Sequence, residues 1–135
     1  AALDRLGFKV EAKEFGFTES HQVAVNVSNL GGGERVSKTL EMNDIILNMN
    51  MLPHEPLRNH DHPDGIRIGV QEMTRFGMKQ AEMERIAELI KECVIDNKSV
   101  KDEVNRFRRD YQDVKYSYDN LPDDMAKKTF SKAKK

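Results

Sequence analysis

The chain is organised around the sequence Gly65-Ile66-Arg67-Ile68-Gly69-Val70-Gln71-Glu72-Met73-Thr74-Arg75-Phe76-Gly77. In its first half, apolar residues alternate with glycine and polar residues, which is the pattern of a half-buried β-strand. Arg67 lies on the other side of that strand, between Gly65 and Gly69. Because glycine in a strand often marks close approach of a ligand or another backbone, the pattern predicts free space around Arg67. Two interpretations follow: Arg67 binds a carboxylate or phosphate through two parallel hydrogen bonds, or it is a solvated edge-strand arginine.

The complete stretch, followed by an amphipathic helix, resembles the C-terminal domain of the serine hydroxymethyltransferase family. That family has G-[IL]-R-[LIV]-G before a T-x-x-G or T-x-R-G turn. Bacterial and eukaryotic members usually have serine before the first glycine and Thr-Pro-Ala after the second, whereas this chain has Asp64 and Val70-Gln71-Glu72. These differences resemble the archaeal branch. The resemblance covers residues 1–118 and implies the small domain of a pyridoxal-phosphate enzyme.

The family resemblance implies a role for two residues. Arg67 matches the arginine that binds the substrate carboxylate. Asn48, Asn50 and Pro53 match an N-x-N-x-x-P element, in which the second asparagine binds the pterin ring of the one-carbon carrier. The resemblance therefore implies a pterin-binding Asn50. The alternative is that Asn48 and Asn50 only hydrogen-bond the backbone of the turn.

The resemblance also implies what lies elsewhere in the enzyme. Members of the family interconvert serine and glycine and transfer a one-carbon unit to a tetrahydropterin, either tetrahydrofolate or a methanopterin. The lysine that forms the Schiff base with pyridoxal phosphate lies in a large domain that precedes this one, and no lysine here occurs in a matching motif. We therefore expect no catalytic residue in this chain, an inactive fragment, a large catalytic domain as its partner, and a homodimer when complete. The chain opens at Ala1 in the middle of a helical pattern, which also suggests a fragment.

Two other functions stay open at this point. The chain could be a non-catalytic binding or interaction domain without a catalytic half. It could also be the same domain of another pyridoxal-phosphate enzyme, an aldolase or an aminotransferase, although the Asn50 element argues against this.

Composition excludes several classes of protein. Charged residues make up 33% of the 135 residues and the net charge is −1, so charge gives no argument for a nucleic-acid or membrane partner. No apolar run is long enough to cross a membrane. A single cysteine, Cys93, forms no internal disulfide and is typical of the reducing cytoplasm.

Two local motifs are weaker than they look. Gly31-Gly32-Gly33 lacks the spacing of phosphate-binding loops and predicts a turn into a helix. His60-Asp61-His62 could contribute metal ligands, but alternate residues of one loop cannot complete a tetrahedral site alone. We expect a solvated loop and no metal.

The fold class predicted from these patterns is a two-layer α/β (α+β) domain. Three mainly antiparallel or mixed strands are expected near residues 22–28, 44–50 and 65–71, packed by helices on one side. The predicted helices span residues 34–42 and 80–95, and a last helix, capped by Ser99 and Asp102, runs to Val114. Residues 1–118 form the predicted domain. The predicted basic and flexible tail, 119–135, carries Lys127, Lys128, Lys132, Lys134 and Lys135.

Overall fold

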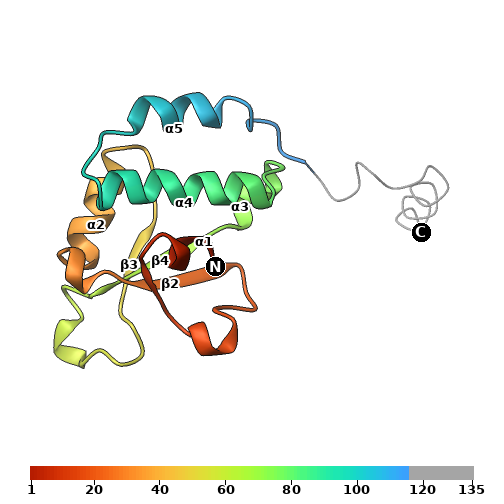
Figure 1. Cartoon of the computed structure of the whole chain (residues 1–135). Helices are drawn as coiled ribbons and strands as arrows, with labels where there is room; N and C mark the ends of the chain where they lie inside the picture. Colours follow the sequence, from red (N-terminus) through yellow and green to blue (C-terminus); the bar gives the residue numbers. More distant parts are fainter. Residues whose placement is uncertain (116–135) are drawn as a thin grey trace, which may run out of the picture.

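A computed structural model describes residues 1–115 of the chain (Figure 1). The strands are β1 (Lys9–Val10), β2 (Gln22–Asn26), β3 (Asn48–Asn50) and β4 (Gly65–Gly69). The helices are α1 (Ala2–Arg5), α2 (Gly32–Glu41), α3 (Gln71–Arg75), α4 (Gln80–Val94) and α5 (Lys101–Arg108). Short 3-10 turns occupy Lys13–Phe15, Ser28–Leu30 and Leu57–Asn59. The predicted tail, 119–135, lies outside the described residues.

The strands form one four-stranded sheet in the order β1-β2-β4-β3. Each of the three neighbouring pairs is antiparallel, so the predicted sheet class is confirmed. Strand β4 lies inside the sheet, between β2 and β3, rather than at an edge. The prediction missed β1, because two residues are too few to show an alternating pattern.

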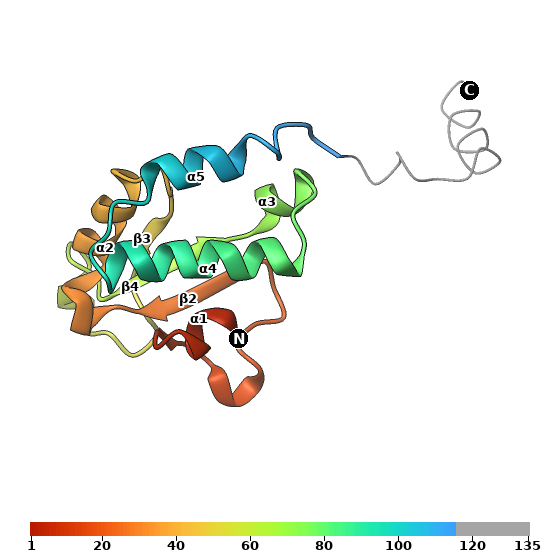
Figure 2. The same ribbon diagram turned by 45° about the horizontal axis from the view of Figure 1, so that its top comes forward.

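Helices cover one face of this sheet and create the core (Figures 1 and 2). Val25 and Ile66, directly opposite each other on β2 and β4, are fully buried. They belong to the same core cluster as Leu40 of α2 and Ile90 of α4. Burying such side chains against the sheet removes apolar surface from water, which is the main favourable term in folding. The two-layer arrangement predicted from the sequence is therefore confirmed.

Helix α5 is fastened to α4 by one arginine. The Arg85 guanidinium binds Glu88 at 2.7 Å and Glu92 at 3.3 Å on its own helix, and also Glu103 of α5. The hydrogen bonds from Glu88 and then Glu103 hold the pKa of Arg85 above its ordinary value. The charge on Arg85 therefore links α4 to α5, a helix with no fully buried residue.

The predicted second strand begins too early. Residues 44–47 form a connection rather than a strand, and Asp44 adopts a left-handed backbone conformation with φ of 61°. Ile45 and Leu47 pack against the core, whereas Ile46 is 86% exposed. The apolar residues 45–47 therefore belong to a loop that packs against the core, and not to a strand.

Three other predicted boundaries are also wrong. Strand β2 ends at Asn26 because a 3-10 turn follows at once, and β4 ends at Gly69 because α3 starts at Gln71. Helix α5 ends at Arg108 rather than Val114. No side chain caps its start, so the Ser99–Asp102 cap is wrong; instead the Val100 N–H donates to Asn43 Oδ1 at 2.8 Å.

Candidate functional site

The face of the sheet away from α2 and α4, which we call the open face, gathers the residues singled out in the sequence. Side chains alternate along a strand, so the neighbours of buried Val25 and Ile66 point to this face. The strand positions on the open face are Lys9, Gln22, Ala24, Asn26, Asn48, Asn50, Gly65, Arg67 and Gly69. No carboxylate occurs among these positions, although 23 of the 135 residues are Asp or Glu.

Arg67 lies at the centre of this face. Its direct neighbours across the sheet are Ala24 on β2 and Asn48 on β3, and both are uncharged. Within the described residues the half-buried Arg67 makes no ion pair and no side-chain hydrogen bond. Because β4 is an internal strand, the interpretation of Arg67 as an edge-strand arginine is wrong. The guanidinium therefore has its donors available for a ligand.

The space predicted beside Arg67 is filled by the protein itself. A Cβ added at Gly65 would lie 2.5 Å from the Asn50 carbonyl oxygen and 2.6 Å from the Leu52 side chain. Gly65 is thus required by the close approach of the chain that follows β3, rather than by a ligand. At Gly69, an added Cβ would meet only the flexible Gln71 side chain, at 2.8 Å.

Asn50 lies on the open face beside Arg67. It is directly opposite Gly65, and Asn48 is directly opposite Arg67, so Asn50 and Arg67 are diagonal neighbours. The Asn50 side-chain N–H donates to the Met51 carbonyl at 2.6 Å, which is the turn hydrogen bond of the alternative interpretation. This bond fixes the amide and leaves its Oδ1 free of a partner among the described residues. The pterin role of Asn50 stays a prediction.

The loop 51–64, which joins β3 to β4, is closed by a residue that the sequence analysis missed. The Glu55 carboxylate accepts the backbone N–H of Leu52 at 2.9 Å and that of Asp64 at 3.0 Å. The sequence gives no sign of this role for Glu55, which lies two residues after Pro53 in a polar loop. Its two partners, Leu52 and Asp64, are brought together only when the chain folds. Glu55 holds the two ends of the loop next to Asn50 and Gly65.

The histidines of this loop point to separate carboxylates. His62 Nδ1 lies 2.9 Å from Glu34, and His54 Nδ1 lies 3.7 Å from Glu11. His60 faces its neighbour Asp61 at 3.2 Å. Across residues 1–115, no group of three His, Cys, Asp or Glu side chains is placed to hold a metal ion.

The Gly31-Gly32-Gly33 motif forms a turn into α2, as predicted. All three N–H groups donate to backbone carbonyls, those of Ser28, Val27 and Pro63. They are therefore not available to a phosphate. A surface hollow of about 560 Å³ lies beside them, and Glu34 in it binds both Lys38 and His62. These bonds, the one from Lys38 first, lower the pKa of Glu34.

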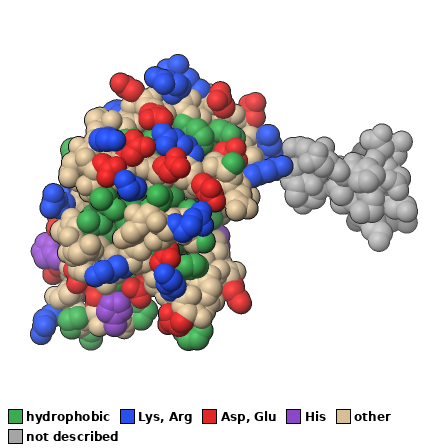
Figure 3. Space-filling model, viewed as in Figure 1, with side chains coloured by type: hydrophobic (Ala, Val, Ile, Leu, Met, Phe, Trp, Pro, Cys, Tyr) green, Lys and Arg blue, Asp and Glu red, His purple; other side chains and the backbone are tan. Residues whose placement is uncertain are grey.

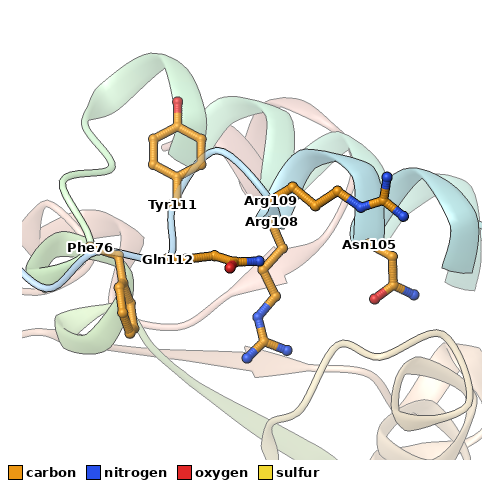
Figure 4. A pocket seen from close by; sticks show the side chains of 6 residues that line it. All are labelled: Phe76, Asn105, Arg108, Arg109, Tyr111 and Gln112. Atoms are coloured by element: carbon orange, nitrogen blue, oxygen red, sulfur yellow. The ribbon is translucent and has the colours of Figure 1, made fainter.

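A second hollow, of about 510 Å³, lies between α5 and the end of α3 (Figure 4). It is lined by Phe76, Asn105, Arg108, Arg109, Tyr111 and Gln112. The Phe76 and Tyr111 rings point in opposite directions, and the two arginines diverge (Figure 4). The Asn105 amide is already bonded to Asp44 at 2.7 Å. This hollow therefore has no convergent set of groups.

No single sign of charge dominates the side of the molecule that Figure 3 shows. Figure 3 shows Lys and Arg side chains mixed with Asp and Glu on the side of the described molecule that is seen there. Among residues 1–115, no helix is long and apolar enough to cross a membrane.

Comparison with known proteins identifies the family. The serine hydroxymethyltransferase family model matches residues 1–90. The chain is 50% identical over 125 residues to serine hydroxymethyltransferase of Saccharolobus islandicus, covering 90% of this chain and 29% of that protein. It is 53% identical over 119 residues to the Metallosphaera sedula protein of the same name, covering 86% of this chain and 28% of that one. The chain thus spans under a third of the length of these relatives.

A solved structure supports the same relationship. The crystal structure of L-threonine transaldolase from Pseudomonas fluorescens in internal aldimine state matches with a TM-score of 0.75 and 27% identity, covering 99% of this chain and 31% of that one. The identity to the archaeal serine hydroxymethyltransferases, at about 50%, is much higher than the identity to this transaldolase. Together, the family match over residues 1–90 and the relatives at about 50% identity show that the chain belongs to the serine hydroxymethyltransferase family.

Proposed function

We propose that the chain acts as the C-terminal small domain of a cytoplasmic serine hydroxymethyltransferase. The complete enzyme would interconvert serine and glycine and transfer the one-carbon unit to a tetrahydropterin. It would do so as a homodimer in which a large catalytic domain binds pyridoxal phosphate. The observation that carries the proposal is Arg67, in the family motif at the centre of the open face, whose strand positions carry no carboxylate.

Arg67 would bind the α-carboxylate of serine or glycine. A charge-assisted hydrogen bond contributes about 1.5–3 kcal/mol, and a guanidinium can make two to one carboxylate. The neutral neighbours Ala24 and Asn48 support this role, because a nearby carboxylate would compete with the substrate. Binding at two points would also fix rotation of the amino acid, so the bond to be broken at its α-carbon would be held in one orientation.

Pyridoxal phosphate supplies the electron sink for cleavage at the α-carbon. The open face fits a role opposite that cofactor, since it offers a guanidinium and several amides to a substrate. We assign no residue of this chain to the cofactor's phosphate or ring. The lysine and the phosphate-binding groups are expected in the large domain.

Asn50 would contact the pterin ring of the one-carbon carrier. Its N–H bond to Met51 orients the amide, so Oδ1 can accept a hydrogen bond from a ring N–H group. Tetrahydrofolate and methanopterin both carry such a ring, and the proposal covers both.

A hybrid enzyme tests the proposal. This chain replaces the matching 29% of the Saccharolobus islandicus protein, so that the large domain comes from that relative. We expect the hybrid enzyme to bind pyridoxal phosphate, to change its cofactor absorbance with glycine, and to cleave serine. Arg67→Ala should shift the glycine response to roughly 10- to 100-fold higher concentrations, whereas Arg109→Ala, on the far side of the molecule, should not. A folded hybrid that holds the cofactor but ignores glycine and serine would refute the proposal.

The non-catalytic interaction domain is tested more simply. The DNA upstream of Ala1 should continue as an open reading frame that encodes the lysine of the catalytic domain. A stop codon immediately upstream of Ala1 would instead favour the interaction domain.

A further inference from the structure

Two large apolar side chains project from the side of the molecule that carries the open face. Phe15 is 81% exposed at the end of a 3-10 turn between β1 and β2, and Leu57 is 87% exposed at the start of the turn in loop 51–64. Figure 1 shows both segments, in orange-red and yellow-green, on the side of the sheet away from α4 and α5. The helices therefore leave this side uncovered.

Phe15 is held in a fixed position by its own loop. The N–H groups of Phe15 and Phe17 both donate to the Ala12 carbonyl, at 3.0 and 2.8 Å. Phe17 packs against the core, although its φ of 76° is an unfavourable backbone conformation for a bulky residue. One phenylalanine thus fastens the loop to the core while the other points into solvent.

Leu57 is presented by a loop that is closed in a comparable way. Glu55 ties the two ends of loop 51–64 together through the N–H groups of Leu52 and Asp64. His54 of the same loop lies 3.7 Å from Glu11, which begins the loop that carries Phe15. The two loops that carry Phe15 and Leu57 therefore approach each other at the His54–Glu11 pair.

Exposure alone does not identify an interface, because single exposed apolar residues are common on protein surfaces. Ile46 is as exposed as Leu57, at 86%, but it lies in the connection that α5 contacts through Asp44. Phe15 and Leu57 differ from Ile46 in flanking the face that carries Arg67. Ile46 therefore serves as a control: it is as exposed as Leu57 but lies away from the open face.

The length of the related proteins indicates what could cover this surface. More than two-thirds of their length lies outside the part that this chain matches. If Arg67 binds a substrate held by that remainder, the side with the open face must meet it. Resting on the proposed function, we infer that Phe15 and Leu57 are the apolar anchors that dock this domain onto the large catalytic domain of the same enzyme. Buried apolar anchors inside a polar rim are the usual source of affinity at such contacts.

The test uses the hybrid enzyme defined above and its variant Phe15→Ser/Leu57→Ser. Calorimetry of the unmutated hybrid should give a single unfolding transition, because docked domains unfold together. The double variant should unfold in two transitions, and its glycine dissociation constant should rise roughly tenfold or more, with pyridoxal phosphate still bound. Ile46→Ser should match the unmutated hybrid in both measurements.

Each outcome separates docking from the proposed function. A double variant that unfolds and binds glycine as the unmutated hybrid does would overturn the docking inference and leave the function intact. The hybrid could instead unfold in one transition, which the double variant splits into two, and yet show no glycine response. That result would support docking and refute the proposed function. Two transitions in the unmutated hybrid would refute docking. The docking inference would also be refuted if the chain alone formed dimers and the Phe15→Ser/Leu57→Ser variant were monomeric, because the partner would then be a second copy of the chain.

Discussion

Arg67 and Asn50 lie on neighbouring antiparallel strands and share one face of the sheet. Arg67 has Ala24 and Asn48 at its sides, and Asn50 has its amide fixed by the Met51 carbonyl. The two side chains therefore offer different chemistry at one place: a permanent positive charge and an oriented hydrogen-bond acceptor. Their proposed roles can be separated by substitution.

Arg67→Lys in the hybrid enzyme should not restore what Arg67→Ala loses. Lysine keeps the charge but loses the planar pair of donors, so it cannot hold a carboxylate at two points. We expect both variants to bind glycine and serine roughly 10- to 100-fold more weakly, with pyridoxal phosphate retained. Cofactor absorbance during glycine titration measures this, and circular dichroism controls for folding. Near-normal serine kinetics in the lysine variant would contradict two-point binding.

Asn50→Ala should weaken the pterin-dependent cleavage of serine. It should leave glycine binding in the absence of pterin nearly unchanged, because the carboxylate contact belongs to Arg67. The measurement is serine turnover against pterin concentration, beside a glycine titration of the same preparation. If serine cleavage and glycine binding weaken by the same factor, Asn50 only holds the turn through Met51.

At the scale of elements, the start of β4 is fixed by close contacts with α2 and with the chain that follows β3. Gly33 at the start of α2 packs against it so closely that an added Cβ would lie 2.3 Å from the Gly65 carbonyl oxygen. The α2 N-terminus and the end of β3 thus both approach the backbone of β4 at Gly65, where the Leu52 side chain also packs. This close contact sets the position of Arg67 two residues further along.

Gly65→Ala should destabilise the chain, whereas Gly69→Ala on the same strand should not. The methyl group at residue 65 would collide with the Asn50 carbonyl and Leu52, and overpacking of this kind costs about 1–3 kcal/mol. At residue 69 the flexible Gln71 side chain can move, so we expect a change within about 0.5 kcal/mol. Urea unfolding of the two variants gives the free energies. Equal stability would show that the end of β3 can shift.

The contact between α5 and the connection before β3 should weaken in acid. Asp44 accepts a hydrogen bond from Asn105 and pairs with Lys101 at 3.3 Å, and these bonds, the one from Asn105 first, lower its pKa. A carboxylate with a lowered folded pKa stabilises the fold above its unfolded pKa and loses that effect as the pH falls through the folded value. Exchange of α5 amides should therefore accelerate below about pH 4. Asparagine suits the left-handed backbone at residue 44, so Asp44→Asn should keep the fold. The exchange of α5 amides should depend less on pH in this variant. An unchanged pH dependence would mean that another carboxylate causes it.

At the scale of the whole molecule, the described residues form a single core between the sheet and the helices. The strand positions of the open face carry Lys9, Arg67 and several side-chain amides, whereas the opposite face carries the buried side chains of the core.

The chain alone should fold and yet have no activity. Its core can support cooperative unfolding, but it has no lysine in a cofactor-binding motif. Mixed with pyridoxal phosphate, the purified chain should show no specific cofactor absorbance and no serine cleavage. Stoichiometric binding of the cofactor together with turnover would contradict this expectation.

The sequence by itself determined the periodic elements and the identity of Arg67. Alternation placed Ile66 and Ile68 on one side of a strand, and the apolar stripe of α4 gave a helix within one residue of its observed end. Such patterns are visible in sequence because neighbouring residues in one element share a face. The motif around Arg67 was recognisable for the same reason, since its spacing is local.

Only the tertiary structure decided what surrounds Arg67. It placed β4 inside the sheet, filled the space at Gly65 with the end of β3, and brought Asn50 beside Arg67. It also turned the apolar run before Asn48 into a packed loop and left Phe15 projecting from a fixed one. These features depend on strand order and register between segments far apart in the chain. Pairing of that kind is set by the fit of whole elements to one another, which local periodicity does not encode.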